Sequence, residues 1–344
     1  MRSSRTLVVV VVLCALVIAA CSDDDSPSAN VGEPAEQAAE KEEPVCPLTG
    51  EEVPRGVEVE RAAVAVKIEN SREARPQSGL EDADLVYEEI VEGGITRFMA
   101  IFHCGDSERA GPVRSARFDD PKIALAFTRI IGYSGANSIV EGELRQNKMA
   151  AINELNGGDA FFRIPPGTLE IHNLFADVSK VRAEAPRSKR KAPRRGVFEF
   201  GEPPPDAKKV RSVTVHFTAS NSIEYRWKGG EWKRWEAGEP FMTKAGAQIG
   251  VPNVVVQQVE VDNSRKIVDP AGNPSPDISL EGRGKAWLFR DGRVLKGEWK
   301  IAKAGRPALF TTRGGKPFSF DVGAIWVELV PSSKGEVKGS VTVR

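Results

Sequence analysis

Two arginines and a serine share one short loop, and their side chains suit the binding of an anion. The loop spans residues 105–117 and carries Arg114, Ser115 and Arg117 near its end. A planar guanidinium donates paired hydrogen bonds to a carboxylate or a phosphate, and a serine hydroxyl adds one more donor. The spacing of these residues therefore predicts a small anion site within the loop.

This loop runs into a predicted helix. Asp120 followed by Pro121 is typical of a helix start, because the aspartate oxygen caps free N–H groups and proline suits the first helical position. We expect the helix over residues 121–130, with the arginines just before its positive end, where a phosphate or carboxylate would bind. Alternatively, the arginines pair within the fold with Glu88, Glu92 or Asp119.

A second group of charges lies in a predicted β-hairpin. Residues 85–102 alternate on either side of a Gly-Gly pair at 93–94, which indicates a two-residue turn. Arg97 would then lie diagonally between the carboxylates of Glu88 and Glu92. These side chains form either an ion-pair ladder on a solvated face or a site wall that orients Arg97 toward a ligand. The predicted register sets Glu92 opposite Ile95, Ile90 opposite Arg97, and Glu88 opposite Met99.

The candidate catalytic bases are few. His172 lies in residues 171–175, where we expect a helix to begin, and a lone histidine there is either a hydrogen-bonded structural residue or a base. Glu88 and Glu92 are the other candidates. The chain has no Gly-x-Ser-x-Gly elbow, His-Glu-x-x-His pair, Walker loop or Rossmann fingerprint. Its motifs therefore favour a binding protein over an enzyme.

The first 21 residues predict export and a lipid anchor. Arg2 and Arg5 precede an apolar run over residues 7–20, and the small residues that end the run are followed at once by Cys21. This pattern is typical of the secretory signal of a bacterial lipoprotein, and the run is shorter than the roughly 20 residues of a membrane span. We expect a signal peptide at residues 1–20, lipid on Cys21, and an acidic disordered tether over residues 21–45.

We therefore expect the protein at the extracytoplasmic face of the cell membrane, where nucleic acid is excluded as a partner. The formal net charge of the chain is zero, so removal of the acidic tether leaves a mildly basic folded part. A weak preference for anionic partners follows. The basic run over residues 187–195 is either a solvated loop or a contact with anionic lipid heads.

Two further cysteines lie in the folded part. Cys46 and Cys104 form an even pair in an oxidising compartment, which predicts a disulfide, with two buried free thiols as the alternative. The three histidines are widely separated and no Cys-x-x-Cys pair occurs, so we expect neither a metal site nor a cofactor.

The kind of secondary structure that the sequence predicts changes near residue 201. Residues 46–200 mix predicted strands and helices, whereas residues 201–344 read almost entirely as strands between glycine turns. Three consecutive prolines at 203–205 mark the boundary. The expected class is α+β, with an N-terminal mixed α/β domain followed by a mostly antiparallel β domain.

Several strings resemble the YerB-like bacterial lipoproteins, a family defined by domains of unknown function. The resemblance covers most of the chain from Cys46 onward. It implies a mixed α/β domain and a mostly β domain on a lipid anchor, and it implies no activity. The strings are Asn70, Arg75-Pro76-Gln77-Ser78-Gly79-Leu80, Ala83-Asp84-Leu85-Val86-Tyr87-Glu88, Glu92-Gly93-Gly94-Ile95-Thr96-Arg97, Gly111-Pro112-Val113-Arg114-Ser115-Ala116-Arg117, His172-Asn173-Leu174, Asn253-Val254-Val255-Val256, Gly282-Arg283-Gly284 and Gly297-Glu298-Trp299-Lys300.

The function that we expect is non-enzymatic binding of an anionic envelope ligand or of a protein partner. The alternative is a transferase or hydrolase that acts on a phosphorylated or glycan polymer of the envelope. A layout of clustered arginines after a proline-containing turn also resembles cell-wall polymer transferases that bind a polyprenyl pyrophosphate. The candidate ligand-binding residues are Arg75, Glu88, Glu92, Arg97, Arg114, Ser115, Arg117, His172 and Asn173.

Overall fold

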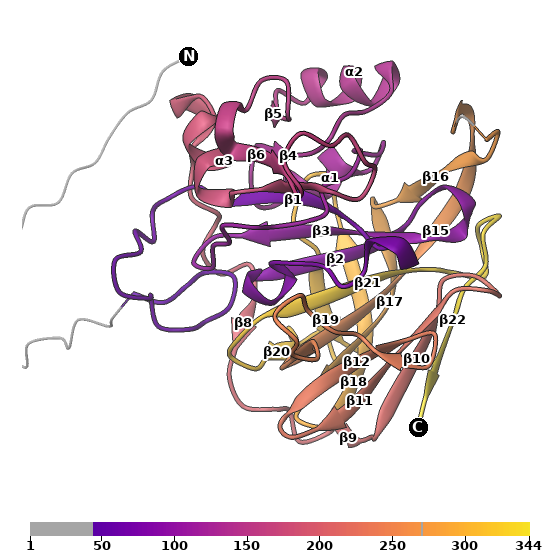
Figure 1. Cartoon of the computed structure of the whole chain (residues 1–344). Coiled ribbons are helices and arrows are strands. Elements are labelled where there is room, and N and C mark those ends of the chain that lie inside the picture. Colours follow the sequence, from indigo (N-terminus) through magenta and orange to yellow (C-terminus); the bar gives the residue numbers. More distant parts are fainter. Residues whose placement is uncertain (1–43, 270) are drawn as a thin grey trace, which may run out of the picture. The chain divides into compact units, whose positions relative to one another are not determined.

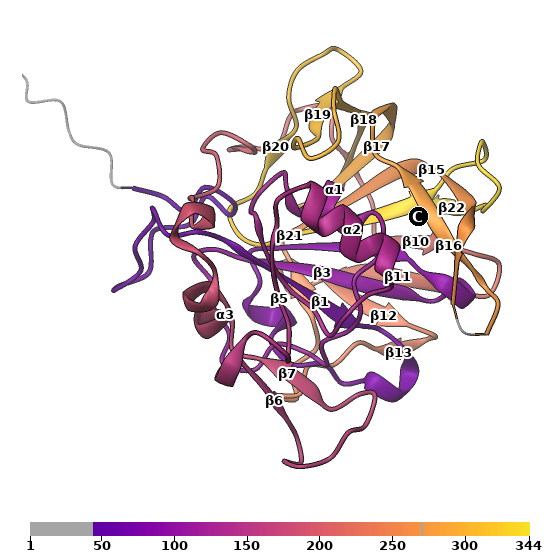
Figure 2. The same cartoon turned by 90° about the horizontal axis from the view of Figure 1, so that it is seen from above.

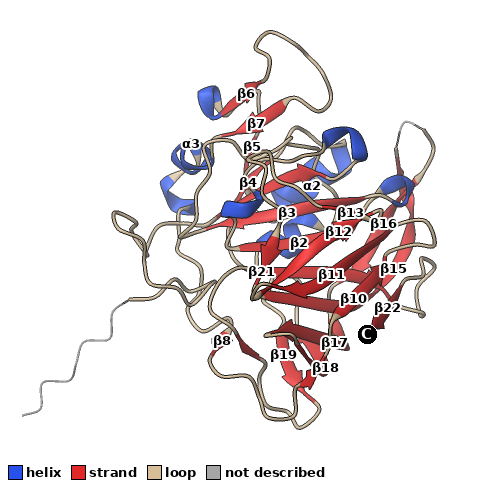
Figure 3. Ribbon diagram, turned by 60° about the horizontal axis from the view of Figure 1, so that its bottom comes forward, coloured by secondary structure: helices blue, strands red, loops and turns tan. Residues whose placement is uncertain are grey.

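Strands dominate this structure, and its helices are few and short (Figure 3). The computed structural model describes residues 44–269 and 271–344, which are 42% strand and 12% helix. The expected α+β class with an N-terminal mixed α/β domain is therefore wrong. Residues 125–129 and 171–173, where helix was expected, form turns and bends, and residues 150–152 form a strand. The α-helices of the described part are α1 (Asp120–Ala124), α2 (Ser138–Gln146) and α3 (Val178–Glu184).

One large mixed sheet runs through both halves of the described chain (Figure 1). Its central join is a parallel pair in which Val86 lies opposite Trp326. Such pairing is non-local, since the partner strands are far apart in sequence. The order along the sheet is β19 (Leu309–Thr312), β18 (Arg293–Ile301), β17 (Gly282–Arg290), β15 (Asn253–Val268), β21 (Ile325–Pro331), β2 (Leu85–Ile90), β3 (Thr96–Phe102), β1 (Val64–Glu69), β4 (Ile130–Gly132) and β5 (Ala150–Ile152), and β16 (Pro274–Ser279) and β9 (Lys208–Lys209) pair beside it.

A second, antiparallel sheet packs on one face of the large sheet. Aromatic side chains join the two, with the rings of Trp232 and Phe289 5.6 Å apart. Two small two-stranded sheets complete the described fold. The strands of the second sheet are β10 (Ser212–His216), β11 (Ser222–Lys228), β12 (Glu231–Glu236), β13 (Glu239–Pro240), β14 (Gly250–Val251) and β22 (Ser340–Val343), and the small sheets pair β6 (Phe161–Arg163) with β7 (Leu174–Ala176) and β8 (Glu199–Phe200) with β20 (Ser319–Phe320).

The helices gather at the end of the molecule that carries β4–β6, away from β9–β12 (Figure 1), and α1 and α2 lie over the large sheet when it is seen from above (Figure 2). Helix α1 ends at Ala124, well short of the expected residue 130. The segment 171–173 is not helical and leads into strand β7. No helix of the described residues is long and apolar enough to cross a membrane.

The hairpin of β2 and β3 forms where we expected it, but its register differs by one residue. Glu89, not Ile90, lies opposite Arg97, because the turn contains three residues, Glu92–Gly94, instead of two. A one-residue slip moves every side chain of one strand to the other face relative to its partner. Glu88 and Arg97 therefore lie on opposite faces of the sheet, and Glu88 does not orient Arg97.

The folded part begins at a covalent link to this hairpin. Cys46 and Cys104 form a disulfide, and both residues are buried. Cys104 directly follows His103, whose ring Nε2 lies 3.0 Å from the carbonyl oxygen of Val59. The disulfide and this contact fasten the segment before β1 to the end of β3. The signal peptide, Cys21 and nearly all of the expected tether lie outside the described residues.

Candidate functional site: an arginine cluster

Three arginines gather beside the hairpin turn, on the face of the large sheet away from the second sheet. Arg97 is the second residue of β3 and lies opposite Glu69 at the end of β1. The backbone of Arg114 donates a hydrogen bond to the carbonyl oxygen of Lys67 (2.9 Å), so the loop runs along the edge of β1. We call Arg97, Arg114, Arg117, Glu69 and Glu92 the arginine cluster.

Two guanidiniums of this cluster converge on one carbonyl oxygen. Nη1 of Arg97 and Nη1 of Arg117 lie 3.0 and 3.1 Å from the oxygen of Ser115. Arg117 also donates through Nε to Glu92 at 2.6 Å, and Arg114 is ion-paired with Glu69. Nε of Arg97 lies 3.6 Å from Glu69 and has no hydrogen-bond partner among the described residues.

Positive charge exceeds negative charge in the cluster, since three guanidiniums face two carboxylates. Burial lowers the pKa of Arg97 to about 10, and repulsion from Arg117 and Arg114 adds to this effect. Burial alone would raise the pKa of Glu69, but Arg97 and Arg114 hold it below its ordinary value. Arg117 lowers the pKa of Glu92 in the same way, against the effect of burial.

The cluster is partly open to solvent. The side chains of Arg114 and Arg117 are 25% and 19% exposed, whereas Arg97 is only 4% exposed. Ser115 is half-buried, and its Oγ lies 3.5 Å from Oγ of Ser134. An anion that approaches from solvent would meet Arg114, Arg117 and these hydroxyls first, with Arg97 behind them.

A second set of charges lies beside the cluster, deeper in the sheet. Nζ of Lys67 donates to Asp120 at 2.8 Å and also contacts Glu89, and all three residues are buried. Burial raises the pKa of Glu89 well above its ordinary value, although the ion pair with Lys67 opposes this shift. These residues form an ion-paired group of their own beside the arginine cluster.

Two of the expected site residues lie on the opposite face of the sheet. Arg75 is paired with Glu236, and its Nη2 donates to the carbonyl oxygen of Asn70 at 2.7 Å. Glu88 accepts two hydrogen bonds from Arg234, at 2.6 and 3.1 Å. The structure thus separates Arg75 and Glu88 from Arg97, Arg114 and Arg117.

Arg234 is the centre of a buried ionic cluster that joins the two sheets. Its guanidinium has no exposed surface and lies over the rings of Phe98 and Phe241, at 5.4 and 4.7 Å. Burial and the nearby Glu88 raise the pKa of Glu328 well above its ordinary value. We call this set the Arg234 cluster; its members are Arg234, Glu88, Glu236, Glu328 and Tyr225.

The histidine and asparagine of the expected site lie elsewhere, between β6 and β7. Asn173 is buried, and its Oδ1 accepts a hydrogen bond from Nη1 of Arg163 at 2.7 Å. His172 is half-buried, and its Nδ1 has no hydrogen-bond partner in the described structure. Arg163 also binds Glu154, so Asn173 belongs to a local network that fixes this turn.

Sequence reasoning missed Glu69, Lys67, Arg234 and Glu236. The first two end an otherwise apolar strand, Val-Ala-Val-Lys-Ile-Glu, and a charge within a buried strand is a signal of a buried ion pair. Arg234 and Glu236 alternate with Trp232 along β12, so the alternation of a strand sets all three side chains on one face.

The family of this chain follows from comparison with known proteins. The N-terminal domain of "Protein of unknown function (DUF3048)" matches residues 48–191, and its C-terminal domain matches residues 213–327. The chain belongs to the DUF3048 family. This membership confirms the resemblance to the YerB-like proteins. The boundary between the two DUF3048 domains falls between stretches of chain that contribute strands to the same large sheet.

A DUF3048 relative is named as a lipoprotein. YerB of Bacillus subtilis (strain 168) is 32% identical over 313 residues, which are 84% of this chain and 89% of YerB. The crystal structure of YerB from Bacillus subtilis matches with a TM-score of 0.72 and 28% identity, and covers 87% of this chain and 99% of that chain. The mostly β fold is therefore shared with a solved structure.

Proposed function

We propose that this protein is a lipid-anchored, extracytoplasmic binding protein that holds an anionic ligand at the arginine cluster. The anchor rests on Cys21, which directly follows the apolar run of the signal, and on the similarity to a relative named as a lipoprotein. The ligand would carry a phosphate or a carboxylate, because guanidinium groups bind both through paired hydrogen bonds.

One observation carries the binding proposal: the guanidiniums of Arg97 and Arg117 converge on the oxygen of Ser115 beside that of Arg114, with one positive charge in excess. Like charges held together in a partly buried place repel each other. A bound anion would remove this repulsion, so the fold favours an anion at the solvent side of Arg114 and Arg117.

The alternative, a transferase or hydrolase, has less support from this geometry. Glu88 has no exposed surface and is held by Arg234, and Glu92 is held by Arg117 and Ser275. A general base must be within hydrogen-bond reach of the proton that it removes. His172 lies between β6 and β7, and the contacts of its neighbour Asn173 are local to that turn.

A ligand-induced thermal shift tests the proposal. The full chain, purified in detergent, is heated with phosphate, pyrophosphate or citrate, and the same panel is applied to Arg114→Gln/Arg117→Gln. A ligand present at one hundred times its Kd stabilises the folded state by about 2.7 kcal/mol. Arg163→Gln is the matched control, because Arg163 is also paired with a glutamate and is 18% exposed.

The expected result is a rise in Tm with pyrophosphate in the wild type and in Arg163→Gln, and its loss in the double variant. The shift caused by the ligand is the readout, so a lower starting Tm of the double variant does not affect the outcome. An equal shift in all three proteins, or none in a folded wild type, would contradict anion binding at this cluster.

A further inference from the structure

The large sheet forks at Gln258, on a long strand that changes partner. Strand β15 pairs with β17 up to Gln257, which lies opposite Ala286, and with β16 from Glu260, which lies opposite Ser279. Between these points the strands β16 and β17 separate. The carbonyl oxygen of Gln258 therefore lacks a partner on β17, and a side chain supplies one instead.

That side chain is the indole of Trp299, from the opposite face of the sheet. Its Nε1 donates to the carbonyl oxygen of Gln258 at 2.7 Å. Gly284 makes this approach possible, since a Cβ atom there would lie 2.5 Å from Nε1 of Trp299 and 2.6 Å from the oxygen of Gln258. This one contact explains two residues of the strings that resemble the family. They are Gly284 of Gly282-Arg283-Gly284 and Trp299 of Gly297-Glu298-Trp299-Lys300.

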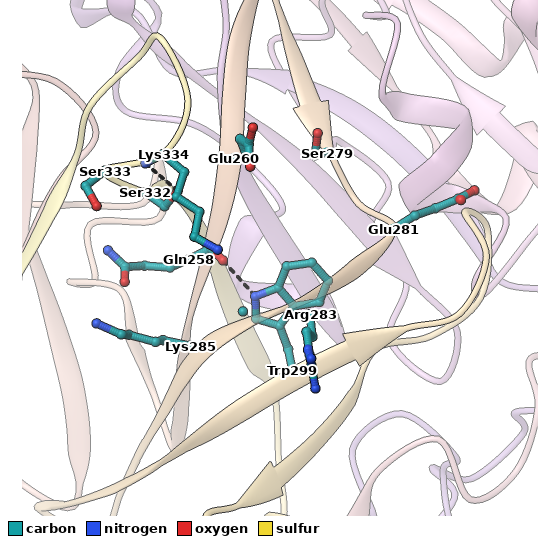
Figure 4. Close-up of a pocket in the computed structure, with 11 residues that line it drawn as sticks. Gln258, Glu260, Ser279, Glu281, Arg283, Lys285, Trp299, Ser332, Ser333 and Lys334 are labelled. Carbon is teal, nitrogen blue, oxygen red and sulfur yellow. Dashed lines mark hydrogen bonds between the residues drawn. The ribbon is translucent and has the colours of Figure 1, made fainter.

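The fork leaves a pocket of about 220 Å³ with Trp299 at its floor (Figure 4). Register sets Arg283 and Lys285 of β17 on the same face as Gln258 and Glu260 of β15. Lys334, in the loop after β21, extends toward Trp299 in Figure 4. The pocket is thus formed by a break in the sheet and is closed beneath by a buried side chain.

The cations of this pocket are unpaired. Arg283, Lys285 and Lys334 form no ion pair with any other described residue. The carboxylate of Glu260 is also unpaired there, and Glu281 accepts a hydrogen bond from the backbone of Ala304 at 2.9 Å. The rest of the pocket is lined by the amide of Gln258 and by the hydroxyls of three serines, Ser279, Ser332 and Ser333.

We propose that this pocket binds an acidic saccharide, with Arg283, Lys285 and Lys334 on its phosphate or carboxylate. Each cation offers N–H donors to anionic oxygens, and the carboxylate of Glu260 accepts from sugar hydroxyls, which donate as well as accept. The mixture of unpaired cations, an unpaired carboxylate and hydroxyls fits a ligand that carries both an acid and several hydroxyl groups.

The size of the pocket limits what enters it. Pockets for drug-sized ligands begin at about 300 Å³, so this one holds a single sugar unit at a time. A bare anion would use the three cations and leave Glu260 without a partner. The saccharide site is separate from the arginine cluster and does not depend on the function proposed for it.

Calorimetric titration of the full chain in detergent tests the saccharide proposal. The probes are glucuronic acid, glucose 6-phosphate and a hyaluronan tetrasaccharide, with glucose and inorganic phosphate for comparison. Every protein carries Arg114→Gln/Arg117→Gln, so that the arginine cluster does not bind the probes, and the site variant adds Arg283→Gln/Lys285→Gln. Lys296→Gln is the matched control, because Lys296 is an exposed lysine on the same face of the sheet but outside the pocket.

We expect at least one acidic sugar to bind this background protein and its Lys296→Gln variant alike, and to bind the site variant at least tenfold more weakly. We also expect glucose and phosphate each to bind at least tenfold more weakly than that acidic sugar. Equal affinity for phosphate and glucose 6-phosphate would overturn the saccharide assignment. Binding that survives in the site variant, or no binding of any acidic probe, would overturn the site itself.

Discussion

Replacing Arg234 by methionine should remove much of the stability of the fold, and most of the loss should depend on pH. Arg234 is fully buried and binds Glu88 through both Nη1 and Nη2, at 2.6 and 3.1 Å. Methionine keeps much of the volume but not the charge. Glu236 keeps its other partner, Arg75, whereas Glu88 loses the one cation that pairs with it among the described residues.

The magnitude follows from the carboxylate that is left behind. Breaking a buried ion pair by removing one partner typically costs 3–5 kcal/mol. The buried glutamate escapes that cost by taking up a proton, which for an ordinary carboxyl with a pKa near 4.3 costs about 3.7 kcal/mol at pH 7 and about 1 kcal/mol at pH 5. We therefore expect Arg234→Met to lose about 4 kcal/mol at pH 7 and substantially less at pH 5.

Urea unfolding followed by far-UV circular dichroism measures both losses. Arg234→Met/Glu88→Gln should be more stable than Arg234→Met at pH 7 and should show little difference between the two pH values, because glutamine does not ionise. Arg226→Met is the control, since Arg226 is 47% exposed on β11 and its pair with Glu224 should contribute less than about 1 kcal/mol. A loss below about 1 kcal/mol for Arg234→Met at pH 7, or equal losses at both pH values, would refute this account of the Arg234 cluster.

Two further results are expected. The disulfide closes a loop with a sequence separation of 58, so Cys46→Ala/Cys104→Ala should lose up to about 4 kcal/mol in urea unfolding; a loss near zero would show that it does not constrain the unfolded chain. Burial lowers the pKa of His103 to about 4, so an NMR titration should find its ring neutral at pH 5. The ordinary pKa of a histidine is near 6.5. The stability that His103 contributes is therefore present above pH 6.5 and is lost as the pH falls toward 4, by at most about 1.4 kcal/mol per pH unit. A titration midpoint near 6.5 for this ring would contradict its burial.

The hairpin shows what local sequence determines. Its strands and its glycine turn were predicted, since alternation and a Gly-Gly pair are local signals. The register was not, because Glu92 joins the turn and both glycines then take positive φ, 72° and 73°. The same sequence pattern fits a two-residue and a three-residue turn. The length of the turn decides which charged side chains lie opposite each other.

The wider architecture depends on contacts between distant segments. The pairing of β2 with β21 sets Val86 opposite Trp326, far away in the sequence, and no local pattern indicates it. The sequence pattern changes near residue 201, and it does not indicate that strands from both sides of this point share one sheet. The helices were overestimated because apolar spacing in short loops imitates helical periodicity.

The candidate site was predicted in part. The loop of Arg114, Ser115 and Arg117 does lie beside Arg97, since the edge of β1 receives it. The carboxylate that holds Arg97 and Arg114 is Glu69, which the sequence analysis did not single out. Glu88 was assigned to the wrong face by the one-residue slip, which no single-sequence argument would have detected.

Equilibrium dialysis with pyrophosphate tests the central claim, an anion site at the arginine cluster, most directly. The full chain carries Arg283→Gln/Lys285→Gln throughout, so that the pocket at Trp299 does not contribute. The account predicts saturable binding of one pyrophosphate per chain, weakened at least tenfold when Arg114→Gln/Arg117→Gln is added. Binding of equal strength in both proteins, or no saturable binding in either, would contradict it.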